Sequence, residues 1–220
     1  MPVHPFHRQV ASIALTAIGP LGFALGGGNA LMIHGLIDRP THDVDLMVDE
    51  EGAVAAAVEA VETALRDAGL TVERLERETN LSDWFEGFEL ELADWAVTDP
   101  SDGQVMQLQI AHIGRRRDTV TMDVGPVLAL EDALGSKVCA LAGRAELRDY
   151  FDVAAALGRF SVDELIALAR DLDPGLGDED FADIGDRLDA TDDEDFVEEF
   201  GLAAADIAAL RARFTAWPRA

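Results

Sequence analysis

Two aspartates separated by one residue, Asp43 and Asp45, are the side chains whose type and spacing best suit chemistry. On a β-strand, residues two apart point to the same face, so both carboxylates share one face while Val44 points into the core. Two carboxylates placed in this way repel each other unless a cation lies between them. Hard oxygen ligands suit Mg²⁺ or Mn²⁺, which bind through one or two carboxylates together with substrate phosphates. The pair therefore suggests metal-assisted chemistry on a phosphate-containing substrate.

Three consecutive glycines, Gly26 to Gly28, lie upstream of this pair and precede a predicted helix from Asn29 to Leu36. Glycines let the backbone approach phosphates closely, and the positive end of a helix dipole favours anions. Asn29 is a residue type that often caps a helix at its N-terminus. The simpler alternative is a glycine turn followed by a strand end with solvated acids.

Lys137 is the only lysine in the chain, because the other sixteen basic residues are all arginines. It lies on a helix predicted from Leu128 to Leu141. Arg144 and Arg148, seven and eleven residues further on, fall on nearly the same helix face if Gly143 does not end the helix. A cationic stripe of this kind suits a triphosphate or an RNA backbone. The alternative is a lysine that lies along the surface with its charge in solvent.

The elements that must position these residues change in character near Pro126. Before it, alternating and helical patterns are mixed, which predicts an α+β region over 1–125. After it, the pattern is helical, which predicts a second region over 126–220. The strands are predicted at 23–25, 44–48, 71–76, 88–92, 105–113 and 120–124. The helices are predicted at 9–18, 29–36, 52–69, 128–141, 145–157, 161–172 and 203–214, and the acidic stretch 173–199 is predicted as a loop with one short helix or as a mobile segment.

Composition limits the partners and the compartment. The formal net charge of −26 argues against broad electrostatic attraction to nucleic acid, so an RNA substrate would need a local basic patch. No apolar run approaches the roughly 20 residues that span a bilayer, and the N-terminus lacks the features of a signal peptide. A single cysteine, Cys139, forms no internal disulfide and fits a cytoplasmic protein. We interpret it as a small core residue.

Two blocks of this sequence, in the same order and with matching spacing, resemble a known family. The first contains the glycines and the Asp43–Asp45 pair, and the second contains Lys137 and Asp149. They are similar to the opening motif and to the downstream lysine-and-aspartate motif of the AbiEii/AbiGii and MenT-type nucleotidyltransferase toxins, over residues 21–157. The matching segments are Leu25-Gly26-Gly27-Gly28-Asn29-Ala30-Leu31, His34-Gly35, Arg39-Pro40-Thr41, Asp43-Val44-Asp45-Leu46, Leu130-Glu131-Asp132-Ala133-Leu134 and Arg148-Asp149-Tyr150-Phe151-Asp152.

This resemblance implies a polymerase-β-like nucleotidyltransferase core with a mixed sheet, followed by a C-terminal helical region. It implies an enzyme that uses Mg²⁺ or Mn²⁺ and an NTP, and that moves NMP to an RNA acceptor at a tRNA 3′ end, under the control of a cognate antitoxin. The implied residue roles are metal ligation by Asp43 and Asp45, triphosphate contact by Gly27, Gly28 and Asn29, phosphate binding by Lys137, and assistance of the acceptor hydroxyl or orientation of Lys137 by Asp149, with Asp152 as a structural neighbour.

The chain also departs from the family pattern. Asn29 stands where the family often has Thr or Ser, and Gln109 stands where the superfamily usually has a third carboxylate. Gln109 can coordinate or donate a hydrogen bond, but it carries no charge. One-metal chemistry, reliance on Asp149 and lost activity all remain open. Trp84, Phe85, Phe88 and Trp95 form either a base-stacking cluster or, more commonly, part of the core.

Two other functions remain open from the sequence. One is a catalytically weak nucleotide-binding or partner-binding protein on the same fold, which the neutral Gln109 and the net charge favour. The other is a small-molecule nucleotidyltransferase, because an acidic protein suits a cationic acceptor such as an aminoglycoside better than it suits RNA.

Overall fold

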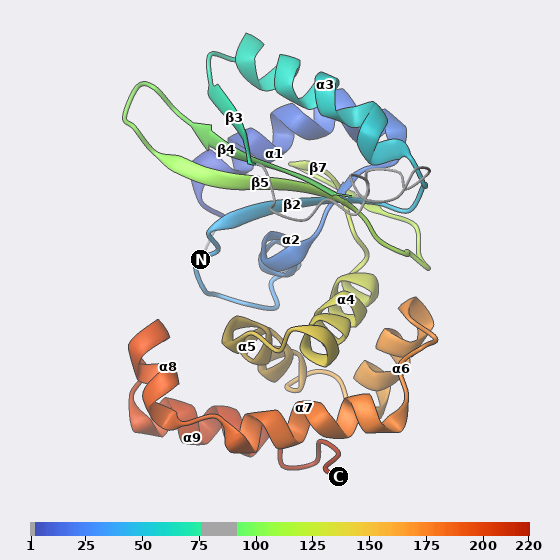
Figure 1. Ribbon diagram of the computed structural model, residues 1–220, viewed down its shortest axis with the longest axis vertical. Coiled ribbons are helices and arrows are strands. Elements are labelled where there is room, and N and C mark those ends of the chain that lie inside the picture. The colour runs from blue at the N-terminus through green and yellow to red at the C-terminus, as the bar shows by residue number, and fades with distance from the viewer. Residues whose placement is uncertain (1–2, 76–91) are drawn as a thin grey trace. The chain divides into compact units, whose positions relative to one another are not determined.

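The computed structural model describes residues 3–75 and 92–220, which form two compact units (Figure 1). The first unit, Met1–Leu130, contains one sheet and three α-helices among its described residues, and the second, Glu131–Ala220, is helical. The mixed α+β class and the C-terminal helical region are therefore confirmed. No helix in the described ranges combines the length and apolar character needed to cross a membrane.

The sheet of the first unit is mixed, and its strand order is β3-β4-β5-β2-β1-β7-β6. Its centre pairs β2 with β5 in parallel and with β1 in antiparallel orientation, so the strand that carries both aspartates is enclosed on both edges. The strands are β1 (Ala24–Leu25), β2 (Asp43–Val48), β3 (Thr71–Leu75), β4 (Leu92–Thr98), β5 (Val105–His112), β6 (Val120–Met122) and β7 (Gly125–Val127).

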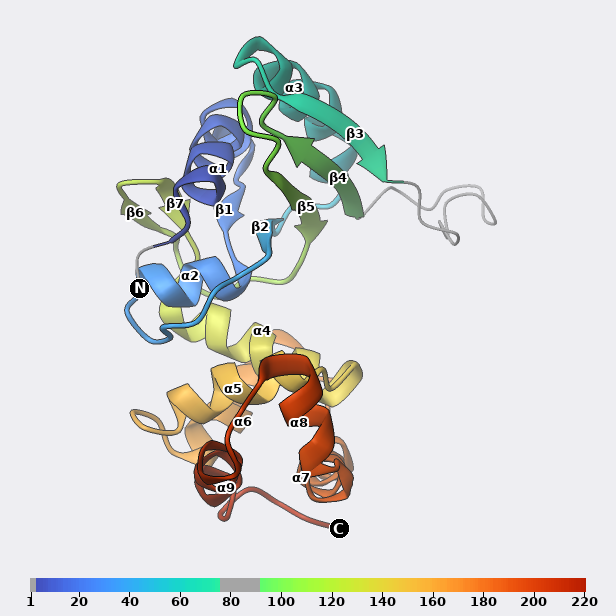
Figure 2. The ribbon, with the colours of Figure 1, turned by 90° about the vertical axis from the view of Figure 1, so that its left-hand side faces the viewer.

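Two helices, α1 (Pro5–Ile18) and α3 (Ala53–Asp67), contact each other and pack against the sheet (Figures 1 and 2). In α3 the buried residues recur at helical spacing, which is why the sequence pattern located this helix. The core beneath them includes Val44, Leu46 and Val48 of β2, each almost fully buried. The core therefore fixes one face of β2 and leaves the opposite face to the aspartates.

The structure corrects two sequence predictions in this unit. The helix α2 spans Gly27–Ile33 with Gly26 at its N-cap position, so Asn29 lies inside its first turn and does not cap it. Pro126 lies within β7, which pairs with β1 and β6, so the sheet extends past the expected break. Of the strand expected at 88–92, only Leu92 lies among the described residues.

The second unit consists of α4 (Leu130–Gly143, its first residue at the unit boundary), α5 (Leu147–Ala156), α6 (Val162–Leu172), α7 (Asp178–Ala190), α8 (Asp193–Phe200) and α9 (Ala204–Arg213). The prediction of a loop with one short helix over 173–199 is wrong, because two helices form there. Their first turns carry acidic side chains, which stabilise each helix through attraction to the positive end of its dipole. Phe181, Ile184 and Leu188 anchor α7 in the core.

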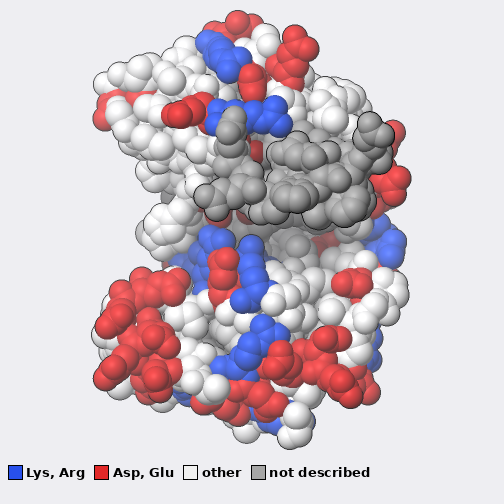
Figure 3. All heavy atoms as spheres, in the orientation of Figure 1, with Lys and Arg blue, Asp and Glu red and all other residues white. Residues whose placement is uncertain are grey.

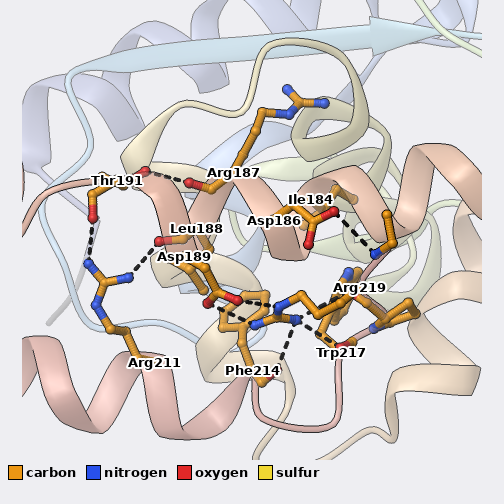
Figure 4. Close-up of polar contacts among 12 residues, drawn as sticks. Ile184, Asp186, Arg187, Leu188, Asp189, Thr191, Arg211, Phe214, Trp217 and Arg219 are labelled. Carbon is orange, nitrogen blue, oxygen red and sulfur yellow. Dashed lines mark hydrogen bonds and ion pairs between the residues drawn. The ribbon is translucent and has the colours of Figure 1, made fainter.

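Basic side chains lie among the acidic ones on the surface of this unit (Figure 3), and arginines hold several of the acids (Figure 4). Arg219 holds Asp189 through two nitrogens, at 2.6 and 3.1 Å. Arg211 donates to the backbone oxygen of Thr191 at 2.7 Å and to Asp193 at 2.8 Å. These contacts tie the C-terminal segments to α7 and the start of α8. The high acid content therefore hid a helical pattern that the apolar residues and these arginines stabilise.

Candidate functional site

The two aspartates lie where their spacing predicted. Both belong to β2, where buried residues alternate with half-buried ones: Val44 and Leu46 are buried, whereas Asp43 and Asp45 are half-buried. The carboxylates therefore share the face of β2 that lies opposite its buried apolar side chains. The flanking strands β1 and β5 hold this backbone in register, so the separation of the two carboxylates is set by the pleat.

The glycines bring the start of α2 against Asp45. The Gly26 amide donates to the backbone oxygen of Asp45 at 2.8 Å. Gly27 adopts a left-handed φ of +56°, and a Cβ there would overlap Oδ2 of Asp45. A Cβ on Gly28 would lie 2.7 Å from the methyl group of Thr41. Close packing thus favours glycine at Gly27 and Gly28, and the start of α2 at Gly27 lies beside the Asp45 carboxylate.

We expect Gly27→Ala to reduce activity about 100-fold, because the new methyl group must displace Asp45 by roughly 1 Å or more. Gly35→Ala is the matched control: Gly35 has a similar φ of +68°, but apart from its chain neighbours no atom of residues 3–75 and 92–220 would lie within 4 Å of a Cβ there. In both variants the left-handed backbone conformation of the new alanine lowers the free energy of unfolding by about 1–2 kcal/mol. Thermal denaturation and nucleotide-transfer rates separate the two effects, and an equal loss of activity in both variants would contradict the prediction.

Asn29 is 1% exposed and joins α2 to the chain that enters β2. Its Nδ2 donates to the backbone oxygen of Asp43 at 2.6 Å, and its Oδ1 accepts from the hydroxyl of Thr41 at 2.9 Å. The Asn29 side chain therefore fixes the position of the Asp43 backbone. A Thr or Ser hydroxyl would have to donate and accept at one oxygen. It would therefore not span these two partners as the separate nitrogen and oxygen of the Asn29 amide do.

A further carboxylate, which the sequence reasoning missed, lies two strands away from Asp45. The register places Gln109 of β5 directly opposite Asp45 and places Asp94 of β4 directly opposite Gln109. Directly paired residues share a face, so the three side chains form one row. Gln109 Nε2 donates to Asp94 Oδ1 at 2.7 Å, which turns the amide oxygen of Gln109 away from Asp94. The sequence reasoning gave no signal for Asp94, because the strand predicted at 88–92 ended before it, whereas β4 spans Leu92–Thr98.

The donor set fits a hard divalent cation. Within residues 3–75 and 92–220, no group of three or more His, Cys, Asp and Glu side chains is placed to hold a metal ion. A cation of the Mg²⁺ type does not require one, because it binds through one or two carboxylates and substrate phosphates. The carboxylate of Asp45 lies against the Gly27 backbone, in the space that any larger residue would fill. Asp43 and Asp45 would hold such an ion.

The second unit places Lys137 in a buried ion cluster rather than along the surface. Its Nζ lies 3.0 Å from Asp149 Oδ1 and 3.1 Å from Asp152 Oδ2. Both aspartates are fully buried on α5, and Arg144 also contacts Asp149 through Nε at 3.0 Å. The compact ammonium of α4 fits between two carboxylates of α5, which gives a physical reason for lysine in a chain that otherwise uses arginine.

The cluster favours the charged forms of Lys137 and Asp149. Burial raises the pKa of Asp149, but the hydrogen bond from Arg144 and the charge of Lys137 outweigh it, so the pKa is lowered. Burial lowers the pKa of Lys137, but the charges of Asp152 and Asp149 together raise it above its usual value. Two cations and two carboxylates therefore balance within this cluster.

The expected cationic stripe along one helix does not form. The helix α4 ends at Gly143 and α5 begins at Leu147, so Arg144 and Arg148 do not continue the face of Lys137. Cys139 is partly buried on α4, its Sγ lies 3.6 Å from the backbone oxygen of Ala169, and burial raises its pKa to about 11. That thiol is protonated at neutral pH, which supports a packing role.

Of the four aromatic residues considered for base stacking, Trp84, Phe85 and Phe88 lie outside the described residues. Trp95 is fully buried, and its indole Nε1 donates to Glu62 at 2.9 Å. Trp95 therefore belongs to the core between β4 and α3.

Comparisons with known proteins agree with this architecture. The structure of JHP933 from Helicobacter pylori is similar, with a TM-score of 0.59, 14% identity, and coverage of 96% of this chain and 91% of that chain. MenT4, a nucleotidyltransferase toxin from Mycobacterium tuberculosis H37Rv, is similar with a TM-score of 0.63, 16% identity, and coverage of 96% and 82%. No curated protein sequence matches significantly.

These two likenesses show the fold, while the sequence comparison shows the family. The sequence pattern of the family described as "Nucleotidyl transferase AbiEii toxin, Type IV TA system" matches residues 14–216, which is nearly the whole chain. Membership of this family implies nucleotidyltransferase activity, an NTP as substrate and an antitoxin as partner. The chain belongs to the AbiEii family of nucleotidyltransferase toxins of type IV toxin–antitoxin systems.

Proposed function

We propose that this toxin transfers NMP from an NTP to an RNA acceptor, at the 3′ end of tRNA, in a reaction that depends on Mg²⁺ or Mn²⁺. The observation that carries the proposal is the placement of Asp43 and Asp45 on one face of β2, with the Gly27 backbone against Asp45. Both substrates are cytoplasmic molecules, so the proposal places the reaction in the cytoplasm.

The proposed reaction is an in-line displacement. The oxygen of the acceptor 3′-hydroxyl forms a bond to the α-phosphorus, and the bond from that phosphorus to the α,β-bridging oxygen breaks. Pyrophosphate leaves with the bonding electron pair, and the hydroxyl proton passes to a carboxylate at this edge of the sheet or to water. Asp43 and Asp45 would hold the divalent ion, which would supply charge stabilisation during the displacement. Gly27 and Gly28 allow backbone amides to approach the triphosphate.

The second unit contributes Lys137 to the same reaction in this proposal. A lysine charge stabilises the negative charge that develops on departing pyrophosphate. Asp149 orients Lys137 rather than accepting the hydroxyl proton, because it is fully buried between Lys137 and Arg144 and its lowered pKa makes it a weak base. Asp152 supplies the second fixed contact of the ammonium group.

The test is to incubate the protein with each labelled NTP, with total tRNA, and with Mg²⁺, Mn²⁺ or EDTA. We expect label on tRNA in the presence of the metal ions and none with EDTA. A parallel reaction contains an aminoglycoside, because an acidic chain suits a cationic acceptor. Label on the drug but not on RNA would show that the acceptor is the drug and not RNA. Absence of label on any acceptor, in conditions where a related toxin works, would overturn the proposal.

Asp94 acts in this proposal as a positioning residue that holds the amide of Gln109. Asp94→Asn keeps an acceptor for the Gln109 Nε2 and should retain activity within about threefold, whereas Asp94→Ala should lose about 10-fold or more. The distinguishing measurement is the Mg²⁺ concentration for half-maximal rate, which should rise only in Asp94→Ala. An equal loss in both variants would mean instead that the charge of Asp94 itself is needed.

A further inference from the structure

A cavity of about 490 Å³ in the first unit lies at the end of the sheet where β2 and β5 begin. Its wall includes Phe6 and His7 of α1, Met32 of α2, and Thr41 and His42, which lead directly into Asp43. A volume of this size is typical of small-ligand sites. Apolar and ring-bearing side chains supply most of its lining, which suits a flat heterocycle.

One wall of the cavity is a nearly buried imidazole whose hydrogen-bonding direction is fixed by its neighbours. His7 is 7% exposed, and its Nδ1 lies 3.4 Å from the hydroxyl of Thr41. That hydroxyl donates its only hydrogen to Asn29, and Asn29 in turn donates to the backbone oxygen of Asp43. The backbone oxygen of Asp43 can only accept a hydrogen bond. It therefore fixes the direction of every hydrogen bond in the series from His7 to Asp43.

His7 must therefore donate from Nδ1, because the oxygen of Thr41 has no hydrogen left to give. Burial, reinforced by His4 and His42, lowers the pKa of His7 despite the opposing charge of Asp43, so the ring is neutral at neutral pH. In a neutral ring with hydrogen on Nδ1, Nε2 is an acceptor. The His7 ring lines the cavity, and none of the described residues forms a hydrogen bond with its Nε2.

We propose that this cavity binds the nucleobase of a substrate nucleotide and that Nε2 of His7 accepts a hydrogen bond from its exocyclic amino group. The inference rests on the proposed function, and it specifies bases such as cytosine and adenine. Uracil and hypoxanthine present a carbonyl oxygen at the equivalent position, which meets the lone pair of Nε2 unfavourably. The base belongs either to the NTP or to the 3′ end of the acceptor.

Binding can be tested without catalysis in Asp45→Asn protein, with nucleosides that carry no phosphate. We expect cytidine to bind about 10-fold more tightly than uridine, and adenosine more tightly than inosine, as one lost hydrogen bond predicts. His7→Asn keeps a donor toward Thr41 but removes the Nε2 acceptor, so it should abolish both preferences. Equal binding of each pair, or preferences that survive His7→Asn, would overturn the inference whatever the enzyme's activity.

A second variant tests the cavity without touching His7. Val105 lines the cavity and is 65% exposed, so Val105→Trp should fold normally and weaken the binding of all four nucleosides. Val120→Trp is the matched control, because Val120 is an exposed valine that does not line this cavity. Unchanged binding in Val105→Trp would also refute the proposed location.

Two catalytic arms identify the source of the base. In the first, CTP and UTP compete as donors to a fixed RNA. In the second, RNAs ending in C or U compete for a fixed NTP. The selectivity that disappears in His7→Asn identifies the nucleotide whose base enters the cavity. If His7→Asn changes neither selectivity, the cavity does not serve the reaction and the inference fails, even when transfer itself is observed.

Discussion

Asp45→Asn is expected to lower the rate of nucleotide transfer by about 10³-fold or more, because it removes one of two charges that hold a divalent ion at the reacting phosphate. The variant keeps the size of the side chain that packs against Gly27. Because the shape of the side chain is unchanged, we expect its melting temperature to stay close to that of the wild type. Loss of activity with retained stability identifies a chemical role.

Asp123→Asn is the matched control for this measurement. Asp123 belongs to the same unit, its side chain is 92% exposed, and its described ion pair is with the half-exposed Arg8. An exposed pair of this kind contributes little, so stability and rate should both stay near wild type. Asp43→Asn should resemble Asp45→Asn. If Asp45→Asn kept a tenth or more of the wild-type rate, the assignment of the metal-binding pair would be wrong.

Lys137→Ala is expected to lower the free energy of unfolding by about 3–5 kcal/mol, because removing one partner of a buried ion cluster leaves uncompensated charge. Asp149 and Asp152 are fully buried, both lie against the Lys137 ammonium, and Arg144 contacts Asp149 through Nε at 3.0 Å. Chemical denaturation of the intact chain measures this cost. Loss of transfer in Lys137→Ala alone therefore does not distinguish a catalytic lysine from a structural one.

The double variant Lys137→Met with Asp152→Asn makes that distinction. It removes one charge of each sign and fills the space, so stability should return to near wild type while Asp149 keeps Arg144. We expect it to remain about 100-fold less active, because no cation then neutralises pyrophosphate. Asp152→Asn alone keeps Lys137 and Asp149 together and should stay active. A stable double variant with full activity would show that Lys137 is structural.

The sequence by itself determined the features that depend on local spacing. The alternation of Asp43, Val44 and Asp45 predicted two carboxylates on one strand face, and the structure has this arrangement. The helical spacing of apolar residues located α3 and α6 within a few residues. The glycine turn beside a helix start was also predicted, although the helix begins at Gly27 rather than at Asn29. Each of these follows from one residue's position relative to near neighbours.

Only the tertiary structure decided which distant residues support that local pattern. Asp94 and Gln109 meet because β4 and β5 pair in one particular register, and a shift by one residue would turn both away. His7 lies 34 residues before Thr41, and their contact fixes the direction of a hydrogen-bond chain that no spacing encodes. The surface position that the sequence left open as the alternative for Lys137 is wrong, because its ammonium on α4 lies between two buried carboxylates of α5. Local periodicity sets where a side chain points, but the element packed opposite it sets what that side chain can bind.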